Sequence, residues 1–130
     1  LCKEAGAKRV LPLPVSVPSH CALMKPAADK LAEQLANIEF NEPNVPVINN
    51  VDVSTESSSE AIKEALIKQL YSPVRWTETV EKMAASGVEK MIEVGPGKVL
   101  QGLNKRINKS ISSVSLNDNA SLEKSLELIK

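Results

Sequence analysis

The chain has 130 residues, of which 42% are hydrophobic and 25% are charged. This length favours a single domain, and this apolar content is typical of a folded protein rather than a disordered one. The 16 basic and 16 acidic residues cancel, which argues against a nucleic-acid-binding protein, since such proteins usually carry a basic excess. No apolar run in the sequence is long enough to span a bilayer.

The two cysteines, Cys2 and Cys21, indicate a reducing environment. They do not make a disulfide framework and lack the spacing of a metal site, so we expect a cytoplasmic protein without a structural metal. We also expect no signal peptide. It begins without an initiator methionine, and residues 2–5 resemble the last turn of a helix that Gly6 stops. We therefore expect further polypeptide upstream.

The first part of the chain predicts two strands and a helix. Residues Leu11 to Val17 alternate apolar with proline or polar side chains, which predicts a strand at the edge of a sheet because proline cannot donate to a strand ladder. Leu23 to Ile38 has the periodicity of a helix, and Val45 to Ile48 predicts a short buried strand. Asn49-Asn50 and Asp52 follow that strand, where they either form a turn, our preferred interpretation, or line a site.

The second part predicts alternating helices and strands. Ser57 and Glu60 have the spacing of a capping box, and Ser72-Pro73 pairs an N-cap with a proline at the first helical position. Gly95-Pro96-Gly97 lacks the G-x-G-x-x-G spacing of a phosphate-binding loop and predicts a tight strand-to-helix turn. The predicted order is a helix ending near Leu70, a helix stopped by Gly87, strand Met91 to Val94, a helix carrying Leu100, Leu103 and Ile107, strand Ile111 to Leu116, and a helix marked by Leu122, Leu126 and Ile129. This alternation predicts an α/β fold with a mainly parallel sheet flanked by helices.

His20, the only histidine, is the main candidate for chemistry. It follows the strand predicted to end near Val17 and precedes a helix, and catalytic groups of parallel α/β sheets lie beyond the carboxyl ends of strands. There an imidazole can take a proton from a serine hydroxyl, although a histidine that only hydrogen-bonds near a helix start fits the position equally well. No Gly-x-Ser-x-Gly nucleophile elbow occurs in the chain, so the sequence indicates a base without its serine.

Other reactive side chains favour structural interpretations. Cys21 adjoins His20 and is predicted to be a small buried residue, and Ser19 is predicted to cap a helix rather than act as a nucleophile. Lys98, Lys105 and Lys109 have spacings that would place them on one helical face, with Arg106 beside them. This cluster of four cations is either a solvated face, our preferred interpretation, or a surface that docks an acidic partner.

Four segments carry a family likeness: Val15 to Met24, Val47 to Val51, Gln69 to Trp76 and Glu93 to Gly97. In order and register they resemble the malonyl-CoA:acyl carrier protein transacylases of bacterial type II fatty-acid synthesis. The chain would be the C-terminal part of such an enzyme, less than half of it. The resemblance implies that residues 1–17 end a ferredoxin-like small subdomain and that residues 18–130 belong to a large α/β-hydrolase-like acyltransferase domain.

The resemblance also implies an activity. A serine acyl-enzyme would carry malonate from coenzyme A to the phosphopantetheine thiol of acyl carrier protein, with no cofactor beyond these substrates, in a monomeric enzyme that binds neither nucleic acid nor membrane. His20 matches the general base, and Gln69 matches the residue whose main-chain carbonyl orients that histidine. The serine and the arginine that selects the acyl group match upstream sequence, so the chain alone is predicted to be inactive.

Two other functions remain compatible with the residues. The chain could be a non-catalytic α/β module that docks an acidic carrier protein through the four cations, or it could belong to an acyltransferase domain of a polyketide synthase. A Gly-His-Ser-x-Gly motif in the upstream coding sequence would favour the enzyme, whereas a start codon just before Leu1 would favour the module.

Overall fold

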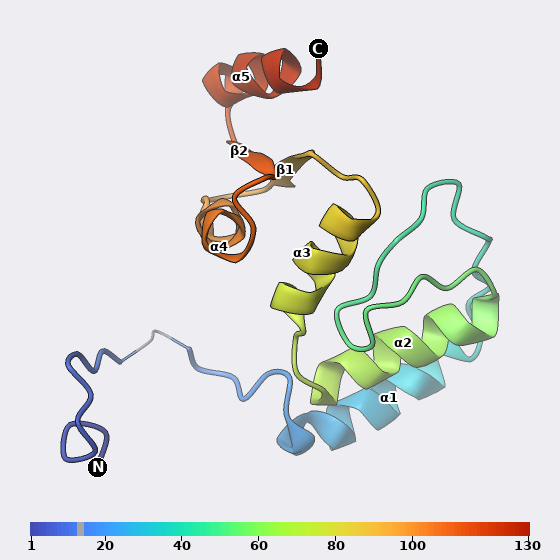
Figure 1. The fold of residues 1–130 in the computed structure, drawn as a ribbon. Helices are drawn as coiled ribbons and strands as arrows, with labels where there is room; N and C mark the ends of the chain where they lie inside the picture. The colour runs from blue at the N-terminus through green and yellow to red at the C-terminus, as the bar shows by residue number, and fades with distance from the viewer. Residues whose placement is uncertain (13–14) are drawn as a thin grey trace.

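The computed structural model describes residues 1–12 and 15–130. Its elements run from a short 3-10 helix to a C-terminal helix (Figure 1). In chain order they are η1 (Ala22–Met24), α1 (Lys25–Leu35), α2 (Ser59–Tyr71), α3 (Trp76–Ala85), β1 (Lys90–Val94), α4 (Val99–Ile107), β2 (Ser112–Leu116) and α5 (Asn119–Ile129).

The two strands form a parallel pair that α4 connects. The register pairs Lys90 with Ser112 and ends with Val94 beside Leu116. Helices α4 and α5 both contact β2, and Figure 1 shows them on opposite sides of the strand pair. The predicted α/β class, with a parallel sheet flanked by helices, is therefore confirmed.

Helices α1 and α2 form a second packed layer. They lie side by side along their lengths (Figure 1), and η1 contacts both of them. Helix α3 leads from this pair to the strands and contacts α4. This arrangement places the segment before η1, which includes His20, beside the carboxyl-terminal end of α2.

Two predicted strands are wrong. Val45 and Val47 are 71% and 58% exposed, and this segment makes only one isolated antiparallel bridge, between Ile48 and Thr55. Pro46 interrupts the row of donors that a ladder needs, and within the described part of the chain no strand lies beside the segment. Of the strand predicted at 11–17, residues 11–12 and 15–17 form no strand, and residues 13–14 lie outside the described part of the chain.

The helix ends also differ from the predicted ones. The Oγ of Ser58, not of Ser57, accepts the hydrogen bond from the Ala61 amide that caps α2. Helix α3 begins at Trp76, and no side chain caps it, so Ser72-Pro73 does not start it. The predicted stop at Gly87 is confirmed, because α3 ends just before this residue and Gly87 has a φ of 87°.

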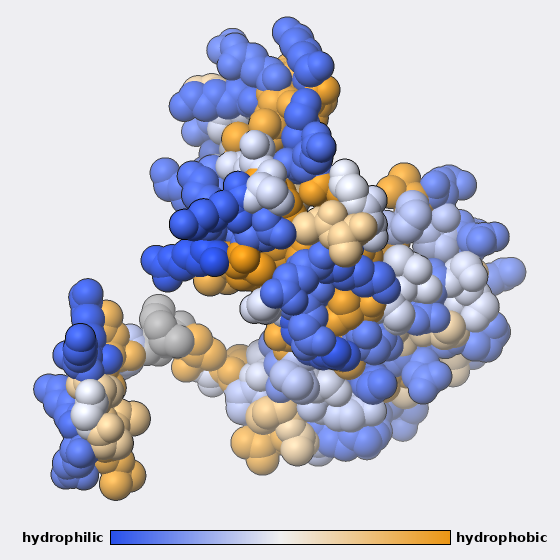
Figure 2. All heavy atoms as spheres, viewed as in Figure 1, coloured by the Kyte–Doolittle hydropathy of each residue, from blue (hydrophilic) through white to orange (hydrophobic). Residues whose placement is uncertain are grey.

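Much apolar surface remains exposed. The chain exposes 9710 Å², whereas a compact monomer of its mass exposes about 6,700 Å². On α5 the predicted apolar residues Leu122, Leu126 and Ile129 are 42% to 57% exposed, while Ser125 is buried. Figure 2 shows apolar residues on the visible surface of several elements. The buried apolar side chains are Ala28, Leu35, Val51, Ala65, Val80 and Ile111.

Candidate functional site

His20 is fixed to the end of α2 through its main chain. Its amide donates a hydrogen bond of 3.1 Å to the carbonyl of Leu70, and its φ of 61° lies in the left-handed region. Few non-glycine residues adopt this conformation, and those that do are often found at functional sites. The residue follows a turn closed by the Ser19 amide on Val17 and comes just before η1. The predicted helix after His20 is confirmed, whereas residues 11–12 and 15–17 of the predicted strand before it form no strand.

The side chain of His20 uses the neighbouring carbonyl of the same helix. Its Nδ1 lies 2.9 Å from the main-chain oxygen of Gln69. A carbonyl oxygen can only accept, so Nδ1 must carry the proton and donate it. Nε2 is then the unprotonated nitrogen, available to take a proton from another group. His20 is exposed, which leaves Nε2 accessible from outside this chain.

The side chain of Gln69 also lies beside the ring. Its amide nitrogen is 3.4 Å from His20 Nδ1 and 3.3 Å from the carbonyl of Ser72. Nδ1 cannot both donate to the Gln69 carbonyl and accept from the Gln69 amide. The contact between Nδ1 and the Gln69 carbonyl is the shorter one, and a carbonyl oxygen can only accept, so Nδ1 donates to it. The side-chain amide of Gln69 therefore donates to the Ser72 carbonyl. The Gln69 side chain thus closes the last turn of α2, and its backbone holds the histidine.

These carbonyls are available because α2 ends there. The last four carbonyls of a helix have no intrahelical donor and carry the negative end of the helix dipole. Gln69 and Leu70 belong to this last turn. Positive charge that appears on the His20 ring when Nε2 takes a proton is therefore placed where a helix favours it. The geometry suits a general base that cycles between neutral imidazole and imidazolium.

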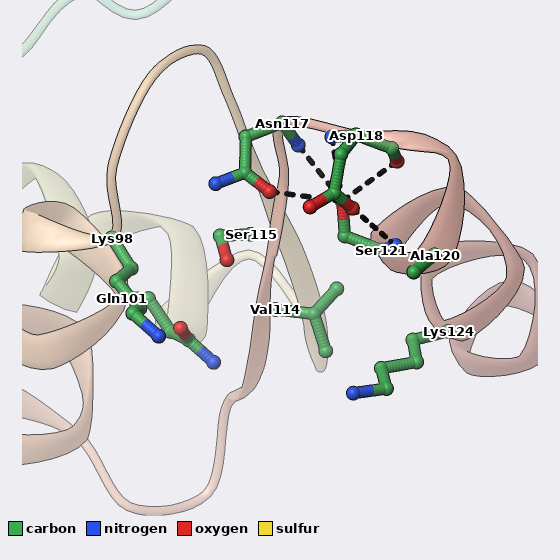
Figure 3. A pocket seen from close by; sticks show the side chains of 9 residues that line it. All are labelled: Lys98, Gln101, Val114, Ser115, Asn117, Asp118, Ala120, Ser121 and Lys124. Atoms are coloured by element: carbon green, nitrogen blue, oxygen red, sulfur yellow. Dashed lines mark hydrogen bonds between the residues drawn. The ribbon is translucent and has the colours of Figure 1, made fainter.

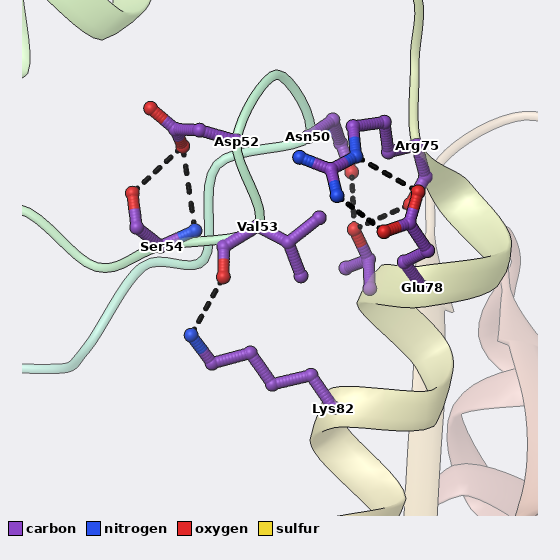
Figure 4. A network of polar contacts seen from close by, with 8 residues as sticks. Asn50, Asp52, Val53, Ser54, Arg75, Glu78 and Lys82 are labelled. Carbon is purple, nitrogen blue, oxygen red and sulfur yellow. Dashed lines mark hydrogen bonds and ion pairs between the residues drawn. The ribbon is translucent and has the colours of Figure 1, made fainter.

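The loop at residues 50–54 makes hydrogen bonds to α3 and to the residue before it (Figure 4). The amide of Arg75 donates to the Asn50 carbonyl at 2.9 Å, and the Thr79 hydroxyl donates to the Asn50 side chain at 3.4 Å. Lys82 Nζ donates to the carbonyl of Val53 at 2.6 Å, and Val53 has a φ of 59°. Hydrogen bonding from Ser54 lowers the pKa of Asp52. The turn-forming interpretation of Asn49-Asn50 and Asp52 agrees with this geometry.

The Gly95-Pro96-Gly97 turn is held by a carboxylate that the sequence analysis did not single out. Glu93 accepts hydrogen bonds from the amides of Leu100 and Gln101, at 3.2 and 2.8 Å, in the first turn of α4. Gly95 and Gly97 have φ values of 143° and 101°, which favour glycine. The predicted strand-to-helix turn is confirmed. The signal available in the sequence was a carboxylate at Glu93, just before the Gly95-Pro96-Gly97 turn and six residues before α4 begins at Val99.

The three lysines predicted to share one helical face do not all lie on α4. Lys105 and Arg106 lie in the last turn of α4, but Lys98 precedes the helix and Lys109 follows it. All four are exposed. Helix α4 is anchored by Asn104, which is 3% exposed and accepts a 3.1 Å hydrogen bond from Trp76 Nε1. The anchored Asn104 fixes how α4 presents Lys105 and Arg106.

Lys98 lines a separate pocket at the carboxyl end of β2 (Figure 3). The pocket has a volume of about 350 Å³ and also contains Lys124, whose amine points into it from α5. Asp118 lies at its rim, and hydrogen bonding from Ser121 lowers the pKa of this carboxyl group. The Asp118 and Ser121 side chains form the capping box of α5. The pocket is thus a polar depression beside α4 rather than an apolar binding cavity.

The remaining reactive side chains have structural contacts. The Cys21 thiol is half-buried and donates to the Pro18 carbonyl at 3.2 Å. Ser19 is exposed and does not cap η1, whose N-cap is Cys21. Within residues 1–12 and 15–130, no group of three or more His, Cys, Asp and Glu side chains is placed to hold a metal ion. None of the described helices is long and apolar enough to cross a membrane.

Comparison with known proteins gives strong matches over almost the whole chain. The malonyl CoA-acyl carrier protein transacylase of Escherichia coli strain K12 is 64% identical over 127 residues, which is 98% of this chain and 41% of that protein. An acyl carrier protein S-malonyltransferase crystal structure from Vibrio cholerae is 71% identical with a TM-score of 0.87, covering 95% of this chain and 40% of that one.

A third match is a complex. In the structure of a type II polyketide synthase acyl-carrier protein with its malonyl-transacylase, the matched chain is 63% identical with a TM-score of 0.91, and 97% of this chain aligns with 41% of it. No protein-family profile matches the chain. The chain spans about two fifths of the length of the curated relatives that it matches.

Proposed function

Because the chain belongs by sequence and fold to the malonyl CoA-acyl carrier protein transacylases, we propose that it supplies the general base of an acyltransferase. The observation that carries this proposal is the 2.9 Å contact between His20 Nδ1 and the Gln69 carbonyl, which leaves Nε2 as the acceptor. In this role the carbonyl replaces the carboxylate of a Ser-His-Asp triad. Relatives named as transacylases favour this function over a non-catalytic module.

The proposed reaction has two half-steps. Nε2 takes the proton of a serine hydroxyl while the serine oxygen forms a bond to the thioester carbon of malonyl-CoA. The imidazolium then returns the proton to the coenzyme A sulfur as the carbon–sulfur bond breaks. In the second half-step the phosphopantetheine thiol of acyl carrier protein gives its proton to Nε2 while its sulfur forms a bond to the carbon of the serine ester. The imidazolium then returns the proton to the serine oxygen as the carbon–oxygen bond breaks, which restores the serine hydroxyl and the neutral histidine. The chain has no Gly-x-Ser-x-Gly elbow, so the serine would lie in other sequence.

The remaining parts of the proposal concern partners and setting. Residues 1–17 would end a ferredoxin-like subdomain, and residues 18–130 would form the C-terminal part of the large domain. Lys105 and Arg106 would dock the acidic carrier protein, with Lys98 and Lys109 extending this surface. We expect no cofactor beyond the two substrates and a cytoplasmic location, in which the free thiols of the chain stay reduced.

The test is malonyl transfer by the protein at its full natural length, with His20 replaced by alanine or asparagine. Asparagine tolerates the left-handed backbone of this position better than alanine does, so it separates loss of the ring from backbone strain. Both variants should slow transfer by about 10²–10⁴-fold, the usual contribution of a positioned base. Activity within a few-fold of wild type would assign His20 a structural role instead.

A further inference from the structure

The end of α2 raises the question of why the Gln69 carbonyl is free. In a continuing α-helix this oxygen would accept a hydrogen bond from the amide four residues later. That residue is Pro73, which has no amide hydrogen. The helical donor that would otherwise pair with the Gln69 carbonyl is therefore missing, because proline carries no amide hydrogen.

Pro73 also determines where the helix stops. A proline disfavours the helical region for the residue before it and favours extended conformations. Ser72 has a φ of −118° and a ψ of 150°, and α2 ends one residue earlier, at Tyr71. The carbonyls of Gln69 and Leu70 then face His20, and each accepts one of its hydrogen bonds. Ser72-Pro73 therefore acts at the end of α2 and does not start α3, which begins at Trp76.

We propose that Pro73 is a positioning residue for the reaction, because it keeps the Gln69 carbonyl unpaired so that this oxygen can orient His20. The proposal rests on the proposed function for its kinetic consequence, but its structural part stands without it. Alanine at position 73 restores an amide donor and removes the restriction on Ser72. Alanine also has a much higher helix propensity than proline. The helix should then extend, and the new amide should compete with His20 Nδ1 for the carbonyl.

The experiment compares Pro73→Ala, Pro73→Gly and the control Pro46→Ala in the protein at its full natural length. Pro46 is exposed and lies in the loop before α2, so its replacement reports the general effect of losing a proline. Amide hydrogen exchange measures protection at residue 73, and nitrogen NMR of the His20 ring reports whether Nδ1 remains protonated. Kinetics of malonyl transfer give kcat and KM.

For Pro73→Ala we expect a protected amide at residue 73, a changed His20 ring signal and a kcat about tenfold lower, with little change in KM for either substrate. Pro73→Gly should have a smaller effect, because glycine supplies the donor but disfavours helix. If only the loss of the proline ring mattered, the order would be reversed, and Pro73→Gly would lower kcat at least as much as Pro73→Ala. That order would overturn the proposal, as would an unprotected amide with an unchanged ring signal. If the structural signals change while transfer is absent in the wild type also, the proposed function fails and the structural part stands.

Discussion

The imidazole Nδ1 of His20 lies 2.9 Å from the main-chain oxygen of Gln69, which is 49 residues further along the chain. The amide of the same histidine donates to the next carbonyl, that of Leu70. One residue is thus attached twice to the last turn of one helix. This double attachment fixes both the backbone and the ring plane, and it gives the ring its donor and acceptor assignment without any charged partner.

Replacing Gln69 with alanine tests whether its backbone or its side chain holds the ring. Alanine leaves the carbonyl in place and removes the amide contact to Ser72. We expect malonyl transfer to fall by about tenfold or less, which corresponds to about 1.4 kcal/mol. Gln34→Ala, an exposed change on α1, is the matched control. A loss as large as that of His20→Ala, with the fold intact, would make the side chain the true partner.

Altering the backbone at the same place should be far more harmful. Leu70→Pro removes an intrahelical amide and displaces the carbonyls that His20 contacts. We expect transfer to fall well below the Gln69→Ala level. Circular dichroism must show that the helical content survives, since an unfolded variant would say nothing about the carbonyls. If the folded variant kept the activity of Gln69→Ala, the main-chain account would be wrong.

Charge reversal on α4 tests the proposed docking surface. Lys105→Glu with Arg106→Glu should raise KM for acyl carrier protein more than KM for malonyl-CoA, because a protein partner covers more of the surface than a thioester does. The control reverses Lys30 and Lys130, two exposed lysines of which one lies on α1 and the other directly follows α5. The effect should weaken at high salt, as expected for exposed charges. Equal changes in both KM values would exclude a specific carrier surface here.

The contact between Trp76 and Asn104 should contribute to stability. Asn104→Ala removes the buried oxygen that accepts from Trp76 Nε1 and leaves that donor without its partner. The free energy of unfolding should fall by about 1–3 kcal/mol. Asn44→Ala, at an exposed loop position, should change it much less. Denaturant titration of the full-length variants measures both, and equal values would mean that the α3–α4 contact does not depend on this hydrogen bond.

The sequence predicted the elements that local patterns determine. Strands β1 and β2, the glycine-rich turn between β1 and α4, and the C-terminal ends of α2 and α3 follow from apolar runs, glycines and breakers within a few residues. The strand predicted around Val47 is wrong because an apolar run becomes a strand only when a neighbouring strand provides hydrogen-bond partners. Here Pro46 and the absence of that neighbour left it in a loop.

The candidate site was predictable only in part. His20 could be singled out as the lone histidine before a helix, and the family resemblance supplied Gln69. The left-handed backbone of His20 and its bond to Leu70 depend on contacts between distant parts of the chain, which no local pattern encodes. One signal was nevertheless present in the sequence: Pro73 stands four residues after Gln69, so that carbonyl could have been identified as free.

Measuring the tautomer of His20 is the most direct test that the Gln69 carbonyl keeps the ring proton on Nδ1. In the full-length protein, long-range nitrogen–proton NMR can distinguish a protonated Nδ1 from a protonated Nε2, with the ring assigned by loss of its signals in His20→Asn. We expect the neutral ring to carry its proton on Nδ1, which donates it to the Gln69 carbonyl, and Nε2 to be unprotonated. A neutral ring protonated on Nε2 would contradict it, because the nitrogen proposed to accept the serine proton would already be occupied.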